Sequence, residues 1–185
     1  MVGQQQTPQR QWPTGNYMGR WHKRMVGQRR THQNRKAGAQ MKPVKTEVLE
    51  WGVKFTFDDR SYCERRYDGD ELWYNENGKR HRDNDQPAII YADGTKEWWF
   101  NDKRHRDNDQ PVIMWADGMK EWWVNDKRHR DNDQPATIQP DGTKEWWING
   151  NLHRDNDQPA IIYADGEKQW WVNGKHIRFE YPGHK

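Results

Sequence analysis

The stretch that decides the fold is His81-Arg-Asp-Asn-Asp-Gln-Pro-Ala-Ile-Ile-Tyr-Ala-Asp-Gly-Thr-Lys-Glu-Trp-Trp99, which the chain repeats four times almost without change. The copies begin at His81, His105, His129 and His153, so successive copies start 24 residues apart. A fixed period in this range is typical of a repeat protein, in which each unit packs mainly against its neighbours. The repeat therefore predicts shape more directly than it predicts chemistry.

Each unit contains two extended pieces joined by an Asp-Gly turn, and in the first unit these pieces are residues 87–91 and 96–100. Asp-Gly favours a type I′ turn, because both central positions need a positive φ. A type I′ turn predicts a register with Tyr91 opposite Lys96 and Ile89 opposite Trp98. The predicted turn residues are Asp93, Gly94, Asp117, Gly118, Asp141, Gly142, Asp165 and Gly166. A further turn follows at Asn101-Asp102 and its copies.

Paired tryptophans lie in the second extended piece of every unit. Two strands per unit advance the sheet by roughly 10 Å, so equivalent residues should stack as ladders, with one Trp of each pair on each face. The ladder residues are Trp98, Trp99, Trp122, Trp123, Trp146, Trp147, Trp170 and Trp171. They could serve as stacking platforms for bases or sugars, but we expect structural packing to be their main role. A single layer cannot bury both rows, so we expect one row to be exposed, or covered by a partner or by the chain's own arm.

The predicted fold is all-β, a single antiparallel sheet of stacked β-hairpins preceded by an extended N-terminal arm. We divide the chain into a basic, non-globular arm (1–45), a degenerate capping repeat (46–80), four regular repeats (81–176) and a C-terminal cap (177–185). A parallel β-helix with this coil length stays open as an alternative. Pairing of Ile89 with Trp98 would favour hairpins, and pairing of Ile89 with Ile113 would favour the helix.

Composition supports a thin structure without a thick core. Apolar residues make up 31% of the 185 residues, well below the roughly 45–50% typical of globular domains. The 13 Trp residues compensate for this low apolar content, because each Trp can bury a large aromatic surface. Cys63 is the only cysteine, so we expect neither an intrachain disulfide nor a cysteine zinc site. We also expect no secretory signal and no membrane span, and an intracellular, cytoplasmic location.

The charge is distributed unevenly. Residues 1–50 contain ten Lys and Arg against Glu47 and Glu50, a net charge of +8, which leaves −5 of the overall +3 for the remainder. Such an arm suits an acidic partner, and alone it should be disordered. It could anchor to protein, neutralise nucleic-acid phosphates with base stacking, or serve as a solubilising tail. Its candidate partner-binding residues are Trp12, Tyr17, Arg20, Trp21, Lys23, Arg24, Arg29, Arg30, Arg35 and Lys36.

The recurring polar residues resemble ligand sites, but their spacing argues against catalysis and metal binding. Histidines roughly 10 Å apart cannot converge on one ion. Asp83-Asn84-Asp85 resembles the opening of a calcium loop but lacks the later Gly and Glu of an EF-hand, and opposite charges at Arg82 and Asp83 could instead bridge adjacent repeats. No nucleophile–base pair or phosphate loop is present. We expect no enzyme activity, no catalytic residue, no metal and no cofactor.

The string Trp-Trp-x-Asn-Gly-Lys-x-His-Arg, followed by Pro-Ala, Asp-Gly and Lys-Glu-Trp-Trp, resembles the MORN repeat across residues 73–178. The 24-residue unit is slightly longer than the usual one, and Asp replaces Gly at Asp102 and Asp126. The 24-residue unit looks like the divergent MORN-like repeats of large DNA viruses of eukaryotes. The resemblance implies a non-enzymatic scaffold but does not identify its partner. We expect this scaffold to dock into a large assembly, as a minor capsid or virion component with capsid proteins as partners. A nucleic-acid-associated protein using residues 1–45 on RNA or packaged DNA is the alternative, and a lipid-binding module is a third class.

Overall fold

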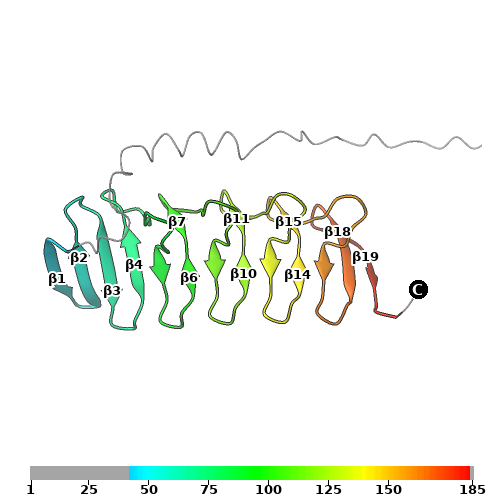
Figure 1. Cartoon of the computed structure of the whole chain (residues 1–185), viewed down its shortest axis with the longest axis horizontal. Helices are drawn as coiled ribbons and strands as arrows, with labels where there is room; N and C mark the ends of the chain where they lie inside the picture. The colour runs from blue at the N-terminus through cyan, green and yellow to red at the C-terminus, as the bar shows by residue number, and fades with distance from the viewer. Residues whose placement is uncertain (1–41, 184–185) are drawn as a thin grey trace, which may run out of the picture. The chain divides into compact units, whose positions relative to one another are not determined.

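The computed structural model describes residues 42–183, and every regular element in this range is a β-strand (Figure 1). The predicted all-β sheet of hairpins is confirmed, because 13 strands form one antiparallel sheet in which chain order and spatial order agree. The predicted arm lies outside the described residues, except for residues 42–45.

The strands of the main sheet follow one another along a single row (Figure 1). They are β1 (Lys45–Leu49), β2 (Gly52–Thr56), β3 (Tyr62–Arg66), β4 (Glu71–Tyr74), β5 (Ile89–Ile90), β6 (Lys96–Glu97), β9 (Ile113–Met114), β10 (Lys120–Glu121), β13 (Thr137–Ile138), β14 (Lys144–Glu145), β17 (Ile161–Ile162), β18 (Lys168–Val172) and β19 (Lys175–Glu180).

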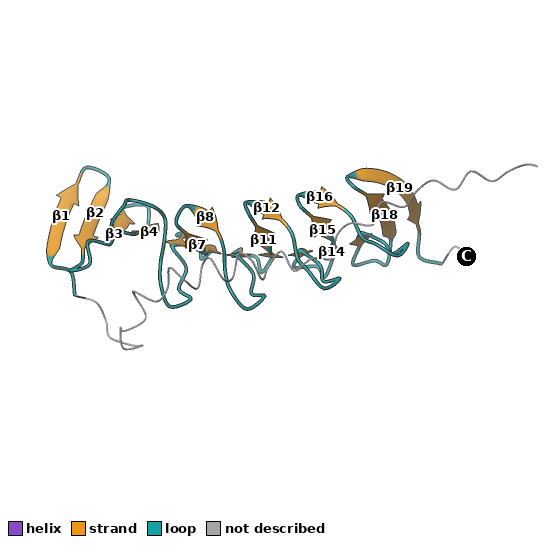
Figure 2. Cartoon of the chain, turned by 90° about the horizontal axis from the view of Figure 1, so that it is seen from above, coloured by secondary structure: helices purple, strands orange, loops and turns teal. Residues whose placement is uncertain are grey.

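Three further hairpins stand beside the main sheet (Figure 2). They are β7 (Trp99–Phe100) with β8 (Lys103–Arg104), β11 (Trp123–Val124) with β12 (Lys127–Arg128), and β15 (Trp147–Ile148) with β16 (Asn151–Leu152). In the first three regular repeats, the chain changes partner at the first Trp of the pair. The Trp98 N–H donates to the Val112 carbonyl of the next repeat, whereas its own carbonyl accepts from the His105 N–H. A regular repeat therefore contains two hairpins.

The predicted type I′ geometry of the Asp-Gly turn is wrong. In the first Asp-Gly turn, Gly94 has a positive φ of 95°, whereas Asp93 does not have one. The Gly94 N–H donates to the Tyr91 carbonyl, and the Tyr91 N–H donates to the Thr95 carbonyl. This is a three-residue loop in which glycine takes the left-handed position. The longer loop moves the register by one residue, so that Ile89 pairs with Glu97 rather than with Trp98.

The type I′ geometry occurs at the second turn of the unit instead. Asn101 and Asp102 both have positive φ, of 51° and 64°, and they connect β7 to β8 as a two-residue loop. Asn tolerates this conformation better than most residues. The parallel β-helix is excluded, because Ile89 pairs within its own hairpin and Ile113 pairs antiparallel with Glu97.

Two rows of cross-strand partners run across the whole main sheet, one on each face, because directly paired residues point to the same side. The inner row is Glu47, Lys54, Glu64, Leu72, Ile89, Glu97, Ile113, Glu121, Thr137, Glu145, Ile161, Gln169 and Phe179. The outer row is Val48, Val53, Arg65, Glu71, Ile90, Lys96, Met114, Lys120, Ile138, Lys144, Ile162, Lys168 and Glu180. In the regular repeats the inner row is mostly buried, whereas Lys96, Lys120 and Lys144 of the outer row are exposed.

Candidate functional site at the Trp ladders

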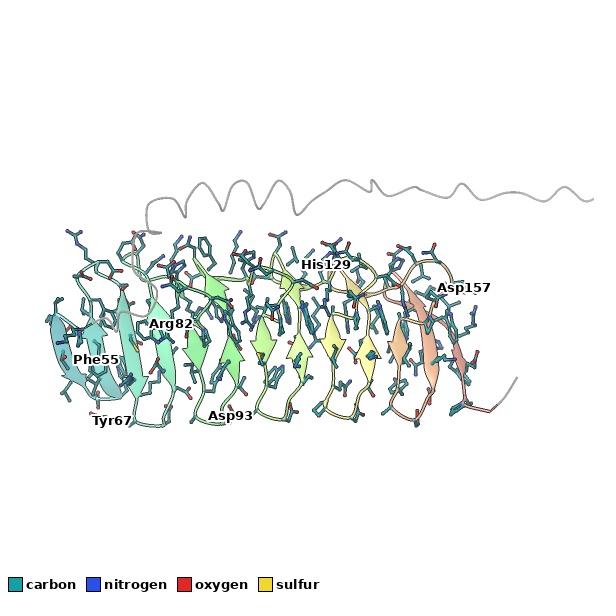
Figure 3. All side chains as sticks on the ribbon, viewed as in Figure 1. Phe55, Tyr67, Arg82, Asp93, His129 and Asp157 are labelled. Atoms are coloured by element: carbon teal, nitrogen blue, oxygen red, sulfur yellow. The ribbon has the colours of Figure 1, made fainter. Side chains whose placement is uncertain are left out.

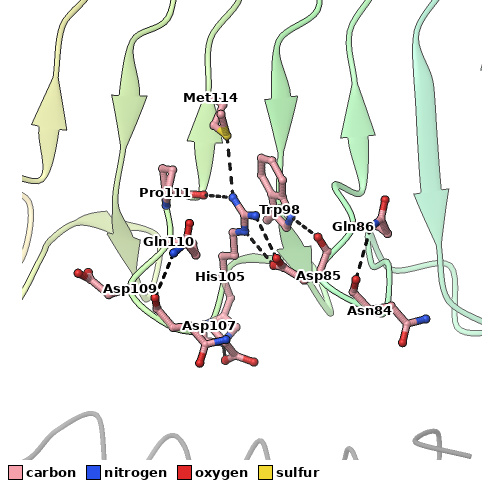
Figure 4. Close-up of polar contacts among 12 residues, drawn as sticks. Asn84, Asp85, Gln86, Trp98, His105, Asp107, Asp109, Gln110, Pro111 and Met114 are labelled. Atoms are coloured by element: carbon pink, nitrogen blue, oxygen red, sulfur yellow. Dashed lines mark hydrogen bonds and ion pairs between the residues drawn. The ribbon is translucent and has the colours of Figure 1, made fainter. Parts of the chain in front are cut away.

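The first Trp of each pair is held by its own loop and by an arginine from the next repeat. Trp98 Nε1 donates to the Asp85 carbonyl at 3.0 Å (Figure 4). The Arg106 guanidinium lies 3.8 Å from the centre of the Trp98 ring. It donates to both carboxylate oxygens of Asp85, at 2.8 and 3.0 Å, and to the Pro111 carbonyl at 3.2 Å. One guanidinium thus joins two repeats by stacking and by bidentate hydrogen bonding.

This arrangement, the Arg–Asp–Trp clamp, recurs at every junction between regular repeats and once more at the C-terminal strand. The further clamps are Arg130 with Asp109 and Trp122, Arg154 with Asp133 and Trp146, and Arg178 with Asp157 and Trp170. The guanidinium-to-ring distances are 3.9, 3.9 and 4.1 Å. The hydrogen bonds from Arg154 lower the pKa of Asp133 below its ordinary value of 3.8. This carboxylate therefore stabilises the fold above that pH, and the contribution is lost as the pH falls below it.

The predicted inter-repeat charge bridge exists, but it uses a different aspartate. Asp83, the predicted partner, accepts at 3.1 Å from His81 Nε2 of its own unit. Asn84 and Asp85 have positive φ, of 61° and 54°, and it is the Asp85 side chain that meets the next repeat's arginine. Both aspartates can be read from the sequence, but the positive φ values of Asn84 and Asp85 cannot.

The second Trp of the first three pairs lies in a stack of alternating indoles and guanidinium groups, the guanidinium–indole ladder. Arg104 lies 4.7 Å from the Trp99 ring and 4.9 Å from the Trp123 ring of the next repeat. Arg128 lies 5.6 Å from the Trp123 ring and 5.1 Å from the Trp147 ring. Charged side chains therefore separate neighbouring indoles while contacting both.

A buried glutamate accompanies each of these arginines. Glu121 is only 1% exposed. Its carboxylate accepts from Trp123 Nε1 at 3.0 Å and from Arg128 at 2.6 Å. In the preceding repeat, Glu97 accepts from Trp99 Nε1 at 2.7 Å. A buried carboxylate needs both a charge partner and hydrogen bonds, and Glu121 has both.

In the third and fourth repeats, the pair of a buried glutamate and an arginine is incomplete. Leu152 occupies the position of Arg128, and there the Glu145 carboxylate accepts from Gln139 at 3.1 Å and from Trp147 at 2.8 Å. In the last repeat, Gln169 takes the glutamate position and accepts from Trp171 at 3.1 Å. The Trp hydrogen bond is kept in every case, whereas the charge is not.

The expectation of an exposed Trp row is wrong. All ladder tryptophans are buried or half-buried, and none is exposed. The clamp covers one row, and the guanidinium–indole ladder covers the other as far as Trp147, because arginine stems and guanidinium planes supply the packing that aliphatic residues do not. Trp171 contacts the His176 ring instead. Among the neighbouring aromatic residues, Tyr91 and Tyr163 are half-buried and only Trp115, at 39%, is exposed.

In the third and fourth units, the histidine links the polar loop to the second turn of its own unit. His129 Nε2 contacts Asp131 at 2.8 Å, and its Nδ1 accepts from the Asn149 N–H at 3.2 Å. The same bond joins His153 to Asn173. An Nδ1 that accepts from a backbone amide requires the proton on Nε2. Across residues 42–183, no group of three or more His, Cys, Asp or Glu could hold a metal ion.

The Asp-Gly turns lie at the opposite end of the strands from His129 and Asp157 (Figure 3). Each Asp side chain accepts from the backbone N–H two residues later, as Asp93 does from Thr95 at 2.7 Å. The other three turns repeat this bond, at Asp117, Asp141 and Asp165. These aspartates therefore stabilise their own turns.

Cys63 is buried in β3, and burial raises the pKa of its thiol to about 12. We expect the folded protein to react with a thiol reagent at pH 8 far more slowly than the unfolded protein, because only the thiolate is nucleophilic. A time course with a chromogenic disulfide, run with and without denaturant, measures this. Equal rates in the two conditions would contradict the placement of Cys63.

The sequence reasoning missed the buried glutamates and the arginines of the guanidinium–indole ladder. A signal was present, because Glu precedes the Trp pair at Glu97, Glu121 and Glu145, and Arg follows that Glu by seven residues at Arg104 and Arg128. The predicted partner-binding residues of the arm, from Trp12 to Lys36, lie outside the described residues.

The fold and its ladders define a β-hairpin repeat protein. No protein-family model matches the chain, and no curated protein matches it. Within residues 42–183, no helix is long and apolar enough to cross a membrane.

Proposed function

We propose that the protein is a non-enzymatic, MORN-like repeat scaffold that docks into a large assembly, as a minor capsid or virion component. One observation carries the scaffold part. The recurring Arg, Asp and Trp residues meet in the same clamp at successive repeats and thereby join one repeat to the next. An active site needs unlike residues that converge once, whereas these residues are engaged in cohesion. The assembly part is supported by the resemblance of the repeat and by the basic arm.

The burial of the Trp ladders changes which surface is proposed for docking. Because neighbouring side chains of the same chain cover both Trp rows, the ladders hold the scaffold together and do not meet the partner. Docking is assigned to the basic arm, because residues 1–50, which contain it, have a net charge of +8. The attraction of such an arm to an acidic protein surface falls with increasing salt.

Sedimentation of the tagged full chain from its native cells tests this proposal. The chain should sediment with a particle far heavier than its own 22.5 kDa, and deletion of residues 1–45 should release it. A matched variant that lacks residues 105–128, one complete repeat, should remain particle-bound. A full-length chain that sediments as free protein contradicts the assembly role.

The charge of the arm supports a second candidate function, association with RNA or packaged DNA. In that case, deletion of residues 1–45 should abolish nucleic-acid binding, and the affinity of the full chain should fall steeply between two salt concentrations, by a slope of about −0.7 to −0.9 per phosphate neutralised. Electrophoretic mobility shifts with single- and double-stranded probes measure this. If the full and truncated chains bind equally, the nucleic-acid role is excluded.

A further inference from the structure

The outer row of the main sheet carries a straight line of lysines. From β5 to β18 this row alternates a half-buried apolar residue with a lysine, because each strand pairs directly with the next. The alternating residues are Ile90, Lys96, Met114, Lys120, Ile138, Lys144, Ile162 and Lys168. Successive lysines lie two strands apart, which places their Cα atoms about 9.6 Å from one another. Like charges therefore stand at regular intervals on one face.

The chain supplies a carboxylate to the last lysine of this line. Lys168 Nζ lies 3.3 Å from a carboxylate oxygen of Glu180, its cross-strand neighbour on β19. The ammonium groups of the other three lysines are exposed and form no ion pair or hydrogen bond with residues 42–183. Their neighbours in the row are Ile and Met, which carry no charge. Lys168 thus shows how a carboxylate from an adjacent extended segment pairs with this line, and three further positions of the same kind are open.

The line needs an anionic occupant that this chain does not bring to it. Residues 1–41 contain eight Lys and Arg and no Asp or Glu. The same row of a second copy offers no carboxylate between Ile90 and Lys168. Nucleic acid is a poor match, because the outer row, as described between residues 42 and 183, contains no aromatic side chain on which a base could stack. Alternating apolar and cationic side chains match an acidic peptide instead.

The spacing of the lysines selects one backbone conformation for such a peptide. In polyproline II, three residues complete a turn and rise about 9.3 Å, so every third side chain lies on the same side at nearly the lysine spacing. From Lys96 to Lys168 the mismatch is about 0.9 Å, which flexible lysine stems absorb. An α-helix with an acid at every seventh residue advances about 10.5 Å per interval and is out of register by about 2.7 Å over this span. A flat strand places every third side chain on alternating faces.

We propose that this line of lysines is a docking surface for an acidic segment of another protein, which lies across the strands in the polyproline II conformation with a carboxylate at every third residue. Its carboxylates pair with Lys96, Lys120 and Lys144, and its intervening residues contact the half-buried Met114 and Ile138 side chains. The surface is separate from the basic arm. The inference stands without the assembly role, because a free repeat protein binds the same segment.

Carbodiimide cross-linking of the full-length protein to a peptide of four Glu-Pro-Pro triplets, mapped by mass spectrometry, tests the proposal. The reagent joins a Glu carboxylate to a lysine amine where the two are in contact. The yield at Lys120 over a peptide concentration series therefore measures binding to the line, separately from peptide held by the arm. A peptide of the same composition with its four Glu residues adjacent should need at least about tenfold more to half-saturate Lys120, because it engages fewer lysines at once.

Two double variants, both read out at Lys120, locate the binding. Lys96→Gln with Lys144→Gln removes the lysines on either side of Lys120 and should raise the half-saturating concentration at least about tenfold. Lys79→Gln with Lys175→Gln is the matched control, because it removes the same charge from two exposed lysines outside the outer row, and it should change nothing.

Three results would overturn the proposal. The first is the same half-saturating concentration in both double variants, and the second is the same value for the spaced and the clustered peptide. The third is stronger protection of Lys120 by a helical peptide with Glu at every seventh residue, or by a single-stranded oligonucleotide of equal charge, than by the Glu-Pro-Pro peptide.

Discussion

Replacing Arg128 by Met should destabilise the protein by about 3–5 kcal/mol, the usual cost of leaving a buried charge without its partner. Glu121 is 1% exposed, and among residues 42–183 Arg128 is its one charged partner within hydrogen-bonding distance, at 2.6 Å. The substitution also removes the guanidinium between the Trp123 and Trp147 rings. Denaturant unfolding followed by Trp fluorescence measures the change in the free energy of unfolding.

The chain itself supplies the control for this prediction. In the last repeat, Gln169 occupies the glutamate position and keeps the indole hydrogen bond without a charge. Adding Glu121→Gln to Arg128→Met should therefore recover most of the lost stability, because the buried charge is removed together with its partner. If the double variant is as unstable as Arg128→Met alone, the buried carboxylate is not the cause.

Trp122→Ala should have an effect of similar size, about 3–5 kcal/mol. Trp122 is 7% exposed, contacts Arg130 at 3.9 Å and donates to the Asp109 carbonyl at 3.0 Å. The substitution removes a large buried side chain and leaves that carbonyl without its donor. Trp115→Ala, in the same repeat, is the matched control, because Trp115 is 39% exposed and its loss should cost less than about 1 kcal/mol. Equal losses for the two variants would contradict the assignment of Trp122 to the clamp.

The sequence predicted the architecture well because the repeat and its turn residues are local signals. The 24-residue period, the position of the Asp-Gly turn and the second turn at Asn101 all correspond to hairpins in the structure. The register was predicted wrongly by one residue. Asp-Gly is compatible with a two-residue and a three-residue loop, and the sequence does not show which of them leaves Asp93 with a negative φ.

The environment of the tryptophans could not be predicted from apolar content. Because a single layer has two faces, we expected one Trp row to be exposed, or covered by a partner or by the arm, but Arg104 and Arg106 cover the Trp99 and Trp98 rings respectively. Guanidinium stacking depends on residues brought together from adjacent repeats. The sequence predicted a charge bridge between repeats but not which aspartate forms it. The backbone conformation at Asp85 selects this residue.

The recurring polar residues couple neighbouring repeats. A double-mutant cycle on Asp109 and Arg130 tests it most directly, because the two belong to adjacent repeats and meet in two hydrogen bonds of 2.9 and 2.8 Å. Asp109→Asn keeps a residue that tolerates the positive φ of 52°, and Arg130→Met keeps the stem over Trp122. The expected coupling energy is at least about 1 kcal/mol. Single effects that simply add, with no coupling, would contradict the claim.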